Sequence, residues 1–231
     1  MKKILFVLAL AGLAPLCWAD QSKQDVDDRL QHAAEVLQQI MATPDKGIPE
    51  EVLDHAKCIA VVPHLVKGGF VFGAEGGRGV ATCRTEHGWS APAFFDVEGG
   101  SWGLQIGVEG IDLVMIIQNQ DGMQQLLNSK FQIGGAVSAA AGPIGRHAAA
   151  NTDWKLNAEI LTYSRAKGVF AGLTLNGAAV HQDSDAMHAF YGPDVTVRQA
   201  LTGGVPAPAA SMAFLHAIHS AHQQARAAES Q

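Results

Sequence analysis

The spacing of apolar residues predicts a helix at the start of the folded chain, over residues 25–41. Its apolar positions recur at steps of four, three, four and three residues: Val26, Leu30, Ala33, Leu37 and Ile40. That spacing places them on one face of a helix. A second helix is expected from Pro49 to about Lys57, because proline is tolerated in a first helical turn and acidic side chains are favoured there.

Between residues 58 and 119 the pattern changes to short apolar runs separated by glycine clusters. The runs cover residues 58–62, 69–74, 80–84, 90–97, 102–109 and 111–118. The connectors at 75–79, 86–88 and 98–101 are short and contain glycine, which is typical of antiparallel hairpins. We therefore expect strands joined by turns at these connectors.

The rest of the chain mixes short strands with helices. We expect helices at 121–130, 183–191, 195–201 and 209–228, and strands within 151–181 with a break at Lys167-Gly168. Residues 131–150 are rich in glycine and alanine, so their backbone can approach another element closely, the alternative being a plain loop. Helices are missing between the central strands, which favours an α+β fold. Its antiparallel sheet or partly closed barrel would carry N-terminal helices and a C-terminal helix.

The first residues have the pattern of a secretory signal peptide. Lys2-Lys3 precede an apolar run over 4–13, and Cys17-Trp-Ala19 resembles a cleavage site. A retained anchor is disfavoured because a bilayer span needs roughly 20 apolar residues. Acylation at Cys17, as in a lipoprotein, is disfavoured because Leu16 is not small. We expect cleavage after Ala19, a domain at 20–202, a linker and helix at 203–231, and a periplasmic or secreted protein.

The charge balance restricts the partners of the mature chain. Removing Lys2 and Lys3 from the 16 basic residues leaves 14 against 22 acidic residues, a net charge of −8. This balance argues against nucleic acid and against nonspecific adhesion to anionic lipid. No second apolar run has membrane length, so we expect no transmembrane span in the mature chain.

Two cysteines, Cys58 and Cys83, follow the expected cleavage point. An oxidising compartment permits disulfides, and we predict that these two are bonded, with two buried free thiols as the alternative. They lack C-x-x-C spacing, so neither a redox site nor a zinc knuckle is indicated.

Two patterns invite a catalytic or metal-binding interpretation. Gly99-Gly-Ser101-Trp-Gly103 fits G-x-S-x-G, but a nucleophile elbow needs a helix after the serine, and the following residues alternate as a strand does. A hydrolase using Ser101 is therefore a minor alternative. His216, His219 and His222 recur at steps of three, which rotates each about 60° from the last on a helix, so they converge poorly on a metal. We expect no enzyme activity, cofactor or metal.

Several longer motifs occur in order along the chain. They are Ala56-Lys-Cys-Ile-Ala-Val-Val-Pro63, Lys67-Gly-Gly-Phe70, Trp89-Ser-Ala-Pro-Ala-Phe94, Gly99-Gly-Ser101, Gln105-Ile-Gly107 with Asp112, Ala141-Gly-Pro-Ile-Gly-Arg146, and Tyr163-Ser-Arg-Ala-Lys-Gly-Val-Phe-Ala-Gly172. Over about 25–192 they resemble the SYLF domain family, also described as the actin-binding domain of certain yeast SH3 proteins. The resemblance implies lipid binding without catalysis, since eukaryotic members bind phosphoinositides and act in membrane remodelling.

This sequence differs from the eukaryotic pattern in its export signal and in the acidic polar face of its first helix. We expect that helix to pack on the domain, since interfacial helices favour basic residues. The predicted function is an exported bacterial, non-catalytic SYLF domain protein of the cell envelope. Its ligand would be a phospholipid or another amphiphile, rather than actin or a specific phosphoinositide. The alternative is an envelope protein-interaction module.

Cationic residues in or near these motifs are the candidates for contacting an anionic head group, because guanidinium and ammonium groups bind phosphate. They are Lys67, Arg78, Arg146, Arg165 and Lys167. The alternative is structural: Arg146 and Arg165 would pair with acids such as Asp153 and Glu159 and hold the fold.

Overall fold

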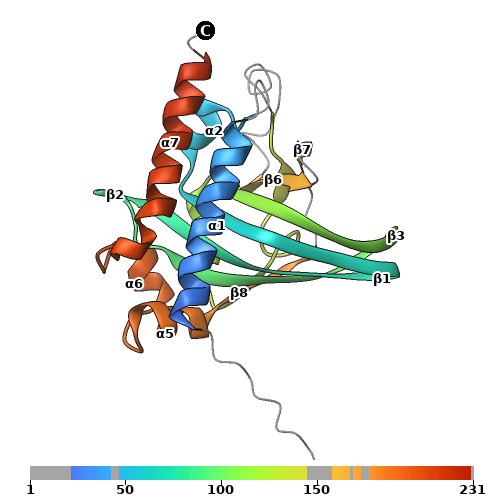
Figure 1. Ribbon diagram of the computed structural model, residues 1–231, viewed down its shortest axis with the longest axis horizontal. Helices are drawn as coiled ribbons and strands as arrows, with labels where there is room; N and C mark the ends of the chain where they lie inside the picture. The colour runs from blue at the N-terminus through green and yellow to red at the C-terminus, as the bar shows by residue number, and fades with distance from the viewer. Residues whose placement is uncertain (1–21, 43–46, 145–157, 167–168, 173–176, 230–231) are drawn as a thin grey trace, which may run out of the picture.

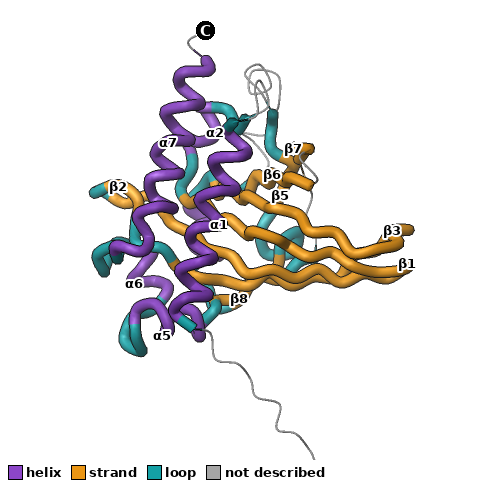
Figure 2. The backbone as a smooth tube through the Cα atoms, viewed as in Figure 1, coloured by secondary structure: helices purple, strands orange, loops and turns teal. Residues whose placement is uncertain are grey.

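Two long strands, β1 (Cys58–Thr85) and β3 (Ala93–Ile117), form the framework of the protein. The structure is a computed structural model, and it describes residues 22–42, 47–144, 158–166, 169–172 and 177–229. The two strands pair antiparallel from Cys58 opposite Ile117 to Ala81 opposite Ala93. Figures 1 and 2 show them running side by side, away from the helices.

This ribbon corrects two of the predicted turns. The connectors at 75–79 and 98–101 are not turns but lie inside β1 and β3, where residues 75–79 pair with 95–99 and residues 98–101 pair with 73–76. The turn at 86–88 is confirmed, since it leads from β1 into β2 (Gly88–Trp89). Glycine clusters are compatible both with tight turns and with close backbone packing. In this protein two of the three clusters lie in closely packed strands.

The β1–β3 ribbon folds back on itself near residues 70 and 71. Three contacts between the outgoing and returning halves of β1 are nested around that point. Cys58 is bonded to Cys83, Lys67 pairs with Glu75, and Val62 faces Gly77. A Cβ added at Gly77 would lie 2.7 Å from Val62 Cγ1. The two halves therefore approach closely enough at this position to leave room only for glycine.

Shorter strands extend the two halves into a curled sheet. One half of β3 pairs with β6 (Ile160–Ala166), which also pairs with β7 (Val169–Gly172) and with β5 (Ala139–Ala141). The other half pairs with β8 (Ala179–Gln182), which pairs with β4 (Lys130–Gln132). The expected α+β fold is confirmed. The β5–β6 pair is parallel, however, so this eight-stranded sheet is mixed.

The glycine- and alanine-rich segment is confirmed as a place of close approach where it is described. Gly142 follows β5 and lies directly against the ring of Tyr163 on β6, leaving no space for a side chain at Gly142. Tyr163 is fully buried, and burial raises the pKa of its hydroxyl. The remainder of the segment, 145–150, lies outside the described residues.

Helix α1 (Lys23–Met41) confirms the first prediction. Ser22 and Asp25 form a capping box at its start, and hydrogen bonds from Ser22 lower the pKa of the Asp25 carboxyl. Its apolar face is completely buried, with Val26, Leu30 and Leu37 fully shielded from solvent. Since that face packs on β1 and on the C-terminal helix, it serves the core of the domain, as expected.

The other predicted helices are present with slightly different limits. They are α2 (Glu50–His55), α3 (Gln120–Leu126), α5 (Ser184–Tyr191), α6 (Val197–Leu201) and α7 (Met212–Glu229), the last preceded by a 3₁₀ turn, η2 (Ala209–Ser211). Helices α1 and α7 lie side by side (Figure 1). Within the described part of the chain, no helix is long and apolar enough to cross a membrane.

Candidate functional site

Lys67, one of the predicted lipid-binding residues, is committed to an ion pair. Its Nζ lies 2.7 Å from Glu75 Oε2, and the two side chains are only 14% and 5% exposed. The pair joins the outgoing and returning halves of β1 close to the bend. The charge of Lys67 is therefore balanced within the protein.

Arg165 is also paired, though not with the predicted acids. It lies directly opposite Asp112 in the β3–β6 pairing, with Nη2 2.6 Å from Asp112 Oδ2. Asp112 also accepts a hydrogen bond of 3.2 Å from the backbone N–H of His64. His64 has a φ of 57°, within a register irregularity of β1, so the carboxylate stabilises an unusual backbone position. Arg165 thus takes part in holding the fold.

The remaining predicted cations do not gather with these two. Arg78 is exposed on the returning half of β1 and makes no ion pair within the described residues. Arg146 and Lys167 lie outside the described residues, as does Asp153, while Glu159 accepts hydrogen bonds from Ser138. The role of these five residues in lipid binding stays a prediction.

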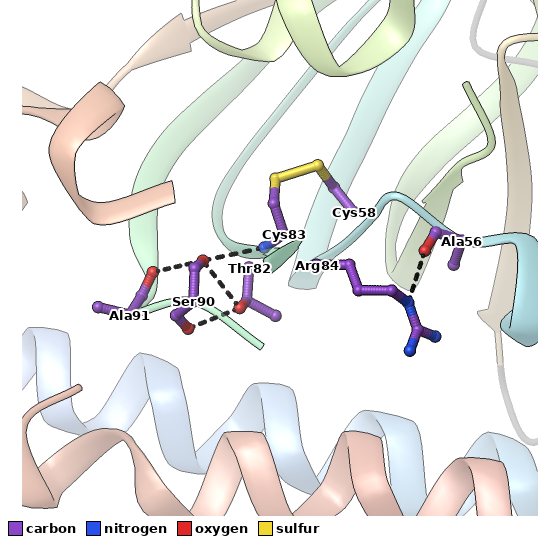
Figure 3. The surroundings of a disulfide bond; sticks show 7 residues. All are labelled: Ala56, Cys58, Thr82, Cys83, Arg84, Ser90 and Ala91. Carbon is purple, nitrogen blue, oxygen red and sulfur yellow. Dashed lines mark hydrogen bonds between the residues drawn. A yellow bond between two sulfur atoms is a disulfide. The ribbon is translucent and has the colours of Figure 1, made fainter. Parts of the chain in front are cut away.

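The predicted disulfide between Cys58 and Cys83 is present, and it joins the two ends of β1. Both cysteines are fully buried. Figure 3 shows the adjoining polar contacts: the Cys83 backbone N–H donates to Ser90 Oγ over 3.0 Å, and Thr82 Oγ1 donates to the Ser90 carbonyl over 2.8 Å. The bond and these contacts fix the position of the β1–β2 turn.

That turn carries Trp89, and Arg84 holds it against the domain. The Arg84 guanidinium lies 4.7 Å from the centre of the Trp89 ring, a distance at which cation and ring attract. Arg84 Nε also donates to the Ala56 carbonyl over 3.2 Å (Figure 3), and Nη2 donates to the Leu53 carbonyl. These carbonyls lie at the end of α2, so Arg84 connects Trp89 to that helix.

His222 on α7 completes this polar cluster. Its Nε2 lies 3.3 Å from Arg84 Nη2, and its Nδ1 lies 3.4 Å from Asp54 Oδ1. Arginine can only donate, so Nε2 accepts and Nδ1 carries the proton that faces Asp54. Burial, and then the charge of Arg84, lower the pKa of His222. The imidazole is therefore neutral at pH 7 and anchors α7 to the Trp89 turn.

Open grooves lie on the two sides of the Trp89 turn. The larger, of about 820 Å³, separates the turn from the segment at 201–207. Its apolar lining includes Met123, Leu201, Val205 and Pro206, and the exposed Lys57 lies at its edge. No ion pair of Lys57 is found within the residues that the structure describes. Arg84 and the exposed Glu86 also line the groove, so it combines apolar residues with two positive charges and one negative charge.

The smaller groove, of about 530 Å³, lies between the turn and α7. Met212, Leu215, His216 and His219 line it, and Met212 is 43% exposed. His222 is directed to Arg84 and Asp54, so the three histidines do not share one ligand position. Among the described residues, no group of three or more His, Cys, Asp or Glu side chains is placed to hold a metal ion.

Ser101 lies in the interior of β3, where its backbone pairs with Gly73 of β1. Every residue from Ala93 to Ile117 is in the strand, and the next helix, α3, begins only at Gln120. The strand–turn–helix geometry of a nucleophile elbow is therefore not formed around this serine.

These observations define a class: an α+β domain with internal ion pairs and open grooves of mixed polar and apolar lining, suited to binding. The model of the Ysc84 family, described as "Las17-binding protein actin regulator", matches residues 98–221. The chain belongs to this family, which is the one indicated by its SYLF motifs.

Characterised relatives agree with this assignment. The chain is 36% identical over 175 residues to LAS seventeen-binding protein 3 of Saccharomyces cerevisiae (strain YJM789), covering 74% of this chain and 38% of the relative. It is 33% identical over 168 residues to human SH3 domain-containing YSC84-like protein 1, covering 72% of this chain and 49% of the relative. The chain thus spans about half or less of the length of these relatives.

Sequence reasoning missed the residues that form the groove. Trp89 stands in a family motif, and Lys57 precedes Cys58 in another, but nothing in the sequence around either residue marks it as a ligand contact. A single lysine beside an apolar strand has no distinctive local pattern. The fold-back of β1, which brings residue 57 near residues 84–89, is what places Lys57 on the groove.

Proposed function

We propose that this protein is an exported, non-catalytic domain that binds an amphiphile with an acyl chain and an anionic head. The groove beside Trp89 carries the proposal. Its accessible apolar residues, Met123, Val205 and Pro206, suit an acyl chain, because each buried CH₂ contributes about 0.8 kcal/mol. Lys57 at the edge suits a carboxylate or phosphate, for which an ammonium group is a common partner.

Other parts of the molecule support this choice of groove. Lys67 and Arg165 are already neutralised by Glu75 and Asp112, so an anion would have to compete with a built-in carboxylate at either place. Lys57 makes no ion pair among the described residues, although the exposed Glu86 lines the same groove. Membership of a family of binding domains agrees with a role that requires no catalysis.

Calorimetry with three soluble amphiphiles tests the groove. We expect the mature protein to bind palmitate and an anionic lysophospholipid below their micelle concentrations, and to bind zwitterionic lysophosphatidylcholine more weakly. Lys57→Glu should weaken palmitate binding about tenfold or more, since a charge-assisted contact contributes roughly 1.5–3 kcal/mol. Lys130→Glu is the matched control, because Lys130 is exposed on β4 and does not line the groove.

Two outcomes would contradict the amphiphile proposal. One is that none of the three lipids binds at low salt. The other is that Lys57→Glu and Lys130→Glu bind palmitate equally well. If only the lysophospholipid binds, the head group is a phosphate rather than a carboxylate. Native mass spectrometry of protein purified from its own cell should then show a retained lipid of that class.

Export is part of the proposal and rests on the charged and apolar pattern of residues 1–19. We expect the protein in the periplasm or the medium, with Asp20 as the first residue after cleavage. Cell fractionation and N-terminal sequencing measure both points. Recovery of the protein from the cytoplasm with Met1 or Lys2 at its start would contradict them.

A protein partner is the second candidate function. The family description and the yeast relative's name both refer to Las17 binding, which supports a protein-binding role in the family. For this chain the partner would be another envelope protein. Crosslinking in the cell envelope, followed by isolation, should then capture one stoichiometric protein with no lipid retained.

A further inference from the structure

The disulfide lies directly beside the groove of the proposed function. Each cysteine has a cationic residue as its outer neighbour, Lys57 before Cys58 and Arg84 after Cys83. Both cations line the groove next to the Trp89 turn. The backbone N–H of Arg84 donates to the Lys57 carbonyl over 2.7 Å. The bond between the two cysteines thus lies at the position where these two residues of the groove meet.

The strand pairing does not by itself hold the two ends of β1 together. Lys57 is anchored to the end of β3, since its backbone N–H donates to the Ile117 carbonyl over 2.7 Å. The residues after Cys83 lie beyond the other end of the β1–β3 pairing, which stops at Ala81. They pair only with β2, which is two residues long. The Trp89 turn therefore depends on other contacts to stay beside Lys57.

The disulfide is the covalent one among these contacts. Arg84 adds hydrogen bonds, through its backbone N–H and through Nε, which donates to the Ala56 carbonyl over 3.2 Å. On the other side, Ser90 Oγ accepts from the Cys83 backbone N–H, and Figure 3 shows the disulfide between these two sets of contacts. Hydrogen bonds can be replaced by bonds to water, whereas the covalent bond cannot. The disulfide is therefore the contact that keeps the 84–89 turn beside Lys57.

We infer that the groove acquires its affinity for an amphiphile only when Cys58 and Cys83 are bonded. In the reduced chain the ends of β1 can separate, so that Lys57 leaves the edge of the groove and the Trp89 turn no longer forms its wall. This inference rests on the proposed function and adds its regulation. Oxidation after export completes the binding site, and a reduced chain in the cytoplasm holds no lipid.

Formation of the bond requires an oxidant. A low-molecular-weight disulfide or a thiol–disulfide exchange protein of the exported compartment supplies the chemistry. One cysteine thiolate attacks a sulfur of the oxidant, which forms a mixed disulfide and releases one thiolate. The second cysteine thiolate then attacks the protein's sulfur in the mixed disulfide and releases the other. The cysteine pair loses two electrons and two protons, and the oxidant is reduced to two thiols.

Burial of the two cysteines determines when the bond forms. Cys58 and Cys83 are fully shielded from solvent, and thiol–disulfide exchange requires access to sulfur. The bond therefore forms before the core closes around it, and the folded protein then protects it from reductant. The site is completed once, during folding, rather than switched repeatedly. A reduced sample has to be prepared by unfolding the protein and refolding it in reductant.

Calorimetry with palmitate compares the bonded and the unbonded protein. Wild type should bind palmitate, and Cys58→Ala with Cys83→Ala should bind it about tenfold or more weakly, the loss expected for at least the Lys57 contact. Wild type refolded in reductant should match the alanine variant, and refolding with oxidised glutathione instead should give wild-type affinity. Circular dichroism measures whether each sample is folded. Where one is not, sucrose is added to all samples alike, because it favours the compact state.

A control variant separates loss of the site from loss of stability. Arg29 of α1 forms a buried ion pair with Asp183 at 2.9 Å and does not line the groove. Arg29→Met should destabilise the domain at least as much as loss of the disulfide does, but the folded protein should bind palmitate as wild type does. Equal loss of affinity in Arg29→Met and in the alanine variant would overturn the inference, because a general loss of stability would explain both.

Different results contradict the inference and the proposed function. If wild type and the alanine variant bind palmitate equally, the groove is intact without the disulfide and only the inference is wrong. If wild type binds neither palmitate nor a lysophospholipid, the proposed function is wrong and its regulation has no basis. If wild type binds only the anionic lysophospholipid, that lipid replaces palmitate in every comparison, with the same outcomes expected.

Discussion

Arg29 of α1 and Asp183, the residue that caps α5, form a buried ion pair between segments 154 residues apart in the sequence. The Nη1 and Oδ2 atoms are 2.9 Å apart, and the side chains are 5% and 3% exposed. Asp183 Oδ1 accepts from the Ala186 backbone N–H over 2.9 Å. The guanidinium lies 5.5 Å from the centre of the Phe94 ring. This ion pair thus connects α1 with the start of α5 and lies beside Phe94 of β3.

Replacing one member of this pair should be strongly destabilising. Arg29→Met keeps much of the length of the side chain but leaves the Asp183 carboxylate buried without its cation. The expected loss is about 3–5 kcal/mol in the free energy of unfolding, measured by denaturant titration. The double variant Arg29→Met with Asp183→Asn should recover part of that loss, because neither member of the pair is then charged.

Lys23→Met provides the comparison on the same helix. Lys23 pairs with Asp27 at 3.0 Å, but the two side chains are 59% and 39% exposed. Exposed pairs of this kind contribute roughly 0.3–0.5 kcal/mol. If Arg29→Met and Lys23→Met lower the free energy of unfolding equally, the buried pair contributes no more to stability than the exposed one.

Asp96 should make stability depend on pH in the mildly acidic range. It lies opposite Arg78 of β1 and His181 of β8. Burial, and then the charge of Asp183, raise its pKa from 3.8 to about 6. The protonated form is favoured in the folded state, so the stabilisation is complete below about pH 4 and is lost as the pH rises through 6.

Asp96→Asn removes this titration and should stabilise the protein only at higher pH. We expect a gain of about 1 kcal/mol at pH 7, after allowing for partial solvent screening, or roughly 2–4 °C in Tm, and no gain at pH 4. Thermal unfolding from pH 4 to 8 measures the difference. Asp28→Asn, at an exposed position of α1, should leave the pH profile unchanged. A gain that is the same at pH 4 and pH 7 would exclude titration of Asp96 as its cause.

Loss of the disulfide between Cys58 and Cys83 should lower the free energy of unfolding. Cys58 and Cys83 are 25 residues apart in sequence, and closing a loop of that size contributes about 3 kcal/mol in the chain-entropy model. Cys58→Ala with Cys83→Ala should therefore lower the free energy of unfolding by about 3 kcal/mol. Wild type unfolded in reductant should reach the same value. An unchanged unfolding midpoint, with free thiols verified by mass spectrometry, would contradict this expectation.

The parts of the fold that the sequence predicted are those with a local signal. Helix α1 buries one face, and its 3.6-residue period is visible in the sequence. The partners of Arg165 and Lys57 depend instead on pairing between distant segments. Asp112 is 53 residues from Arg165 yet directly opposite it, whereas the sequence indicated the nearby Glu159. The groove forms only once β1 has folded back, so no local pattern marks it.

Two of the glycine clusters predicted as turns lie within paired strands, and this too depends on contacts between distant segments. Two glycines of the long strands allow a direct test of how closely the halves of β1 pack. Gly77 and Gly110 both lie in the long strands, but their surroundings differ. A Cβ at Gly77 would be 2.7 Å from Val62 Cγ1 and 3.0 Å from Leu65 Cδ1, while a Cβ at Gly110 would meet no atom within 4 Å. Gly77→Ala should therefore cost about 1–3 kcal/mol through overpacking.

Gly110→Ala should be neutral or should stabilise by up to about 1 kcal/mol, because alanine restricts the unfolded chain more than glycine does. Denaturant unfolding of the two variants measures the contrast. Equal effects would mean that the halves of β1 do not pack face to face. If only Gly77→Ala is destabilising, glycine is required where the outgoing and returning strands meet. The cluster at 75–79 then serves the close packing of the folded ribbon rather than a turn.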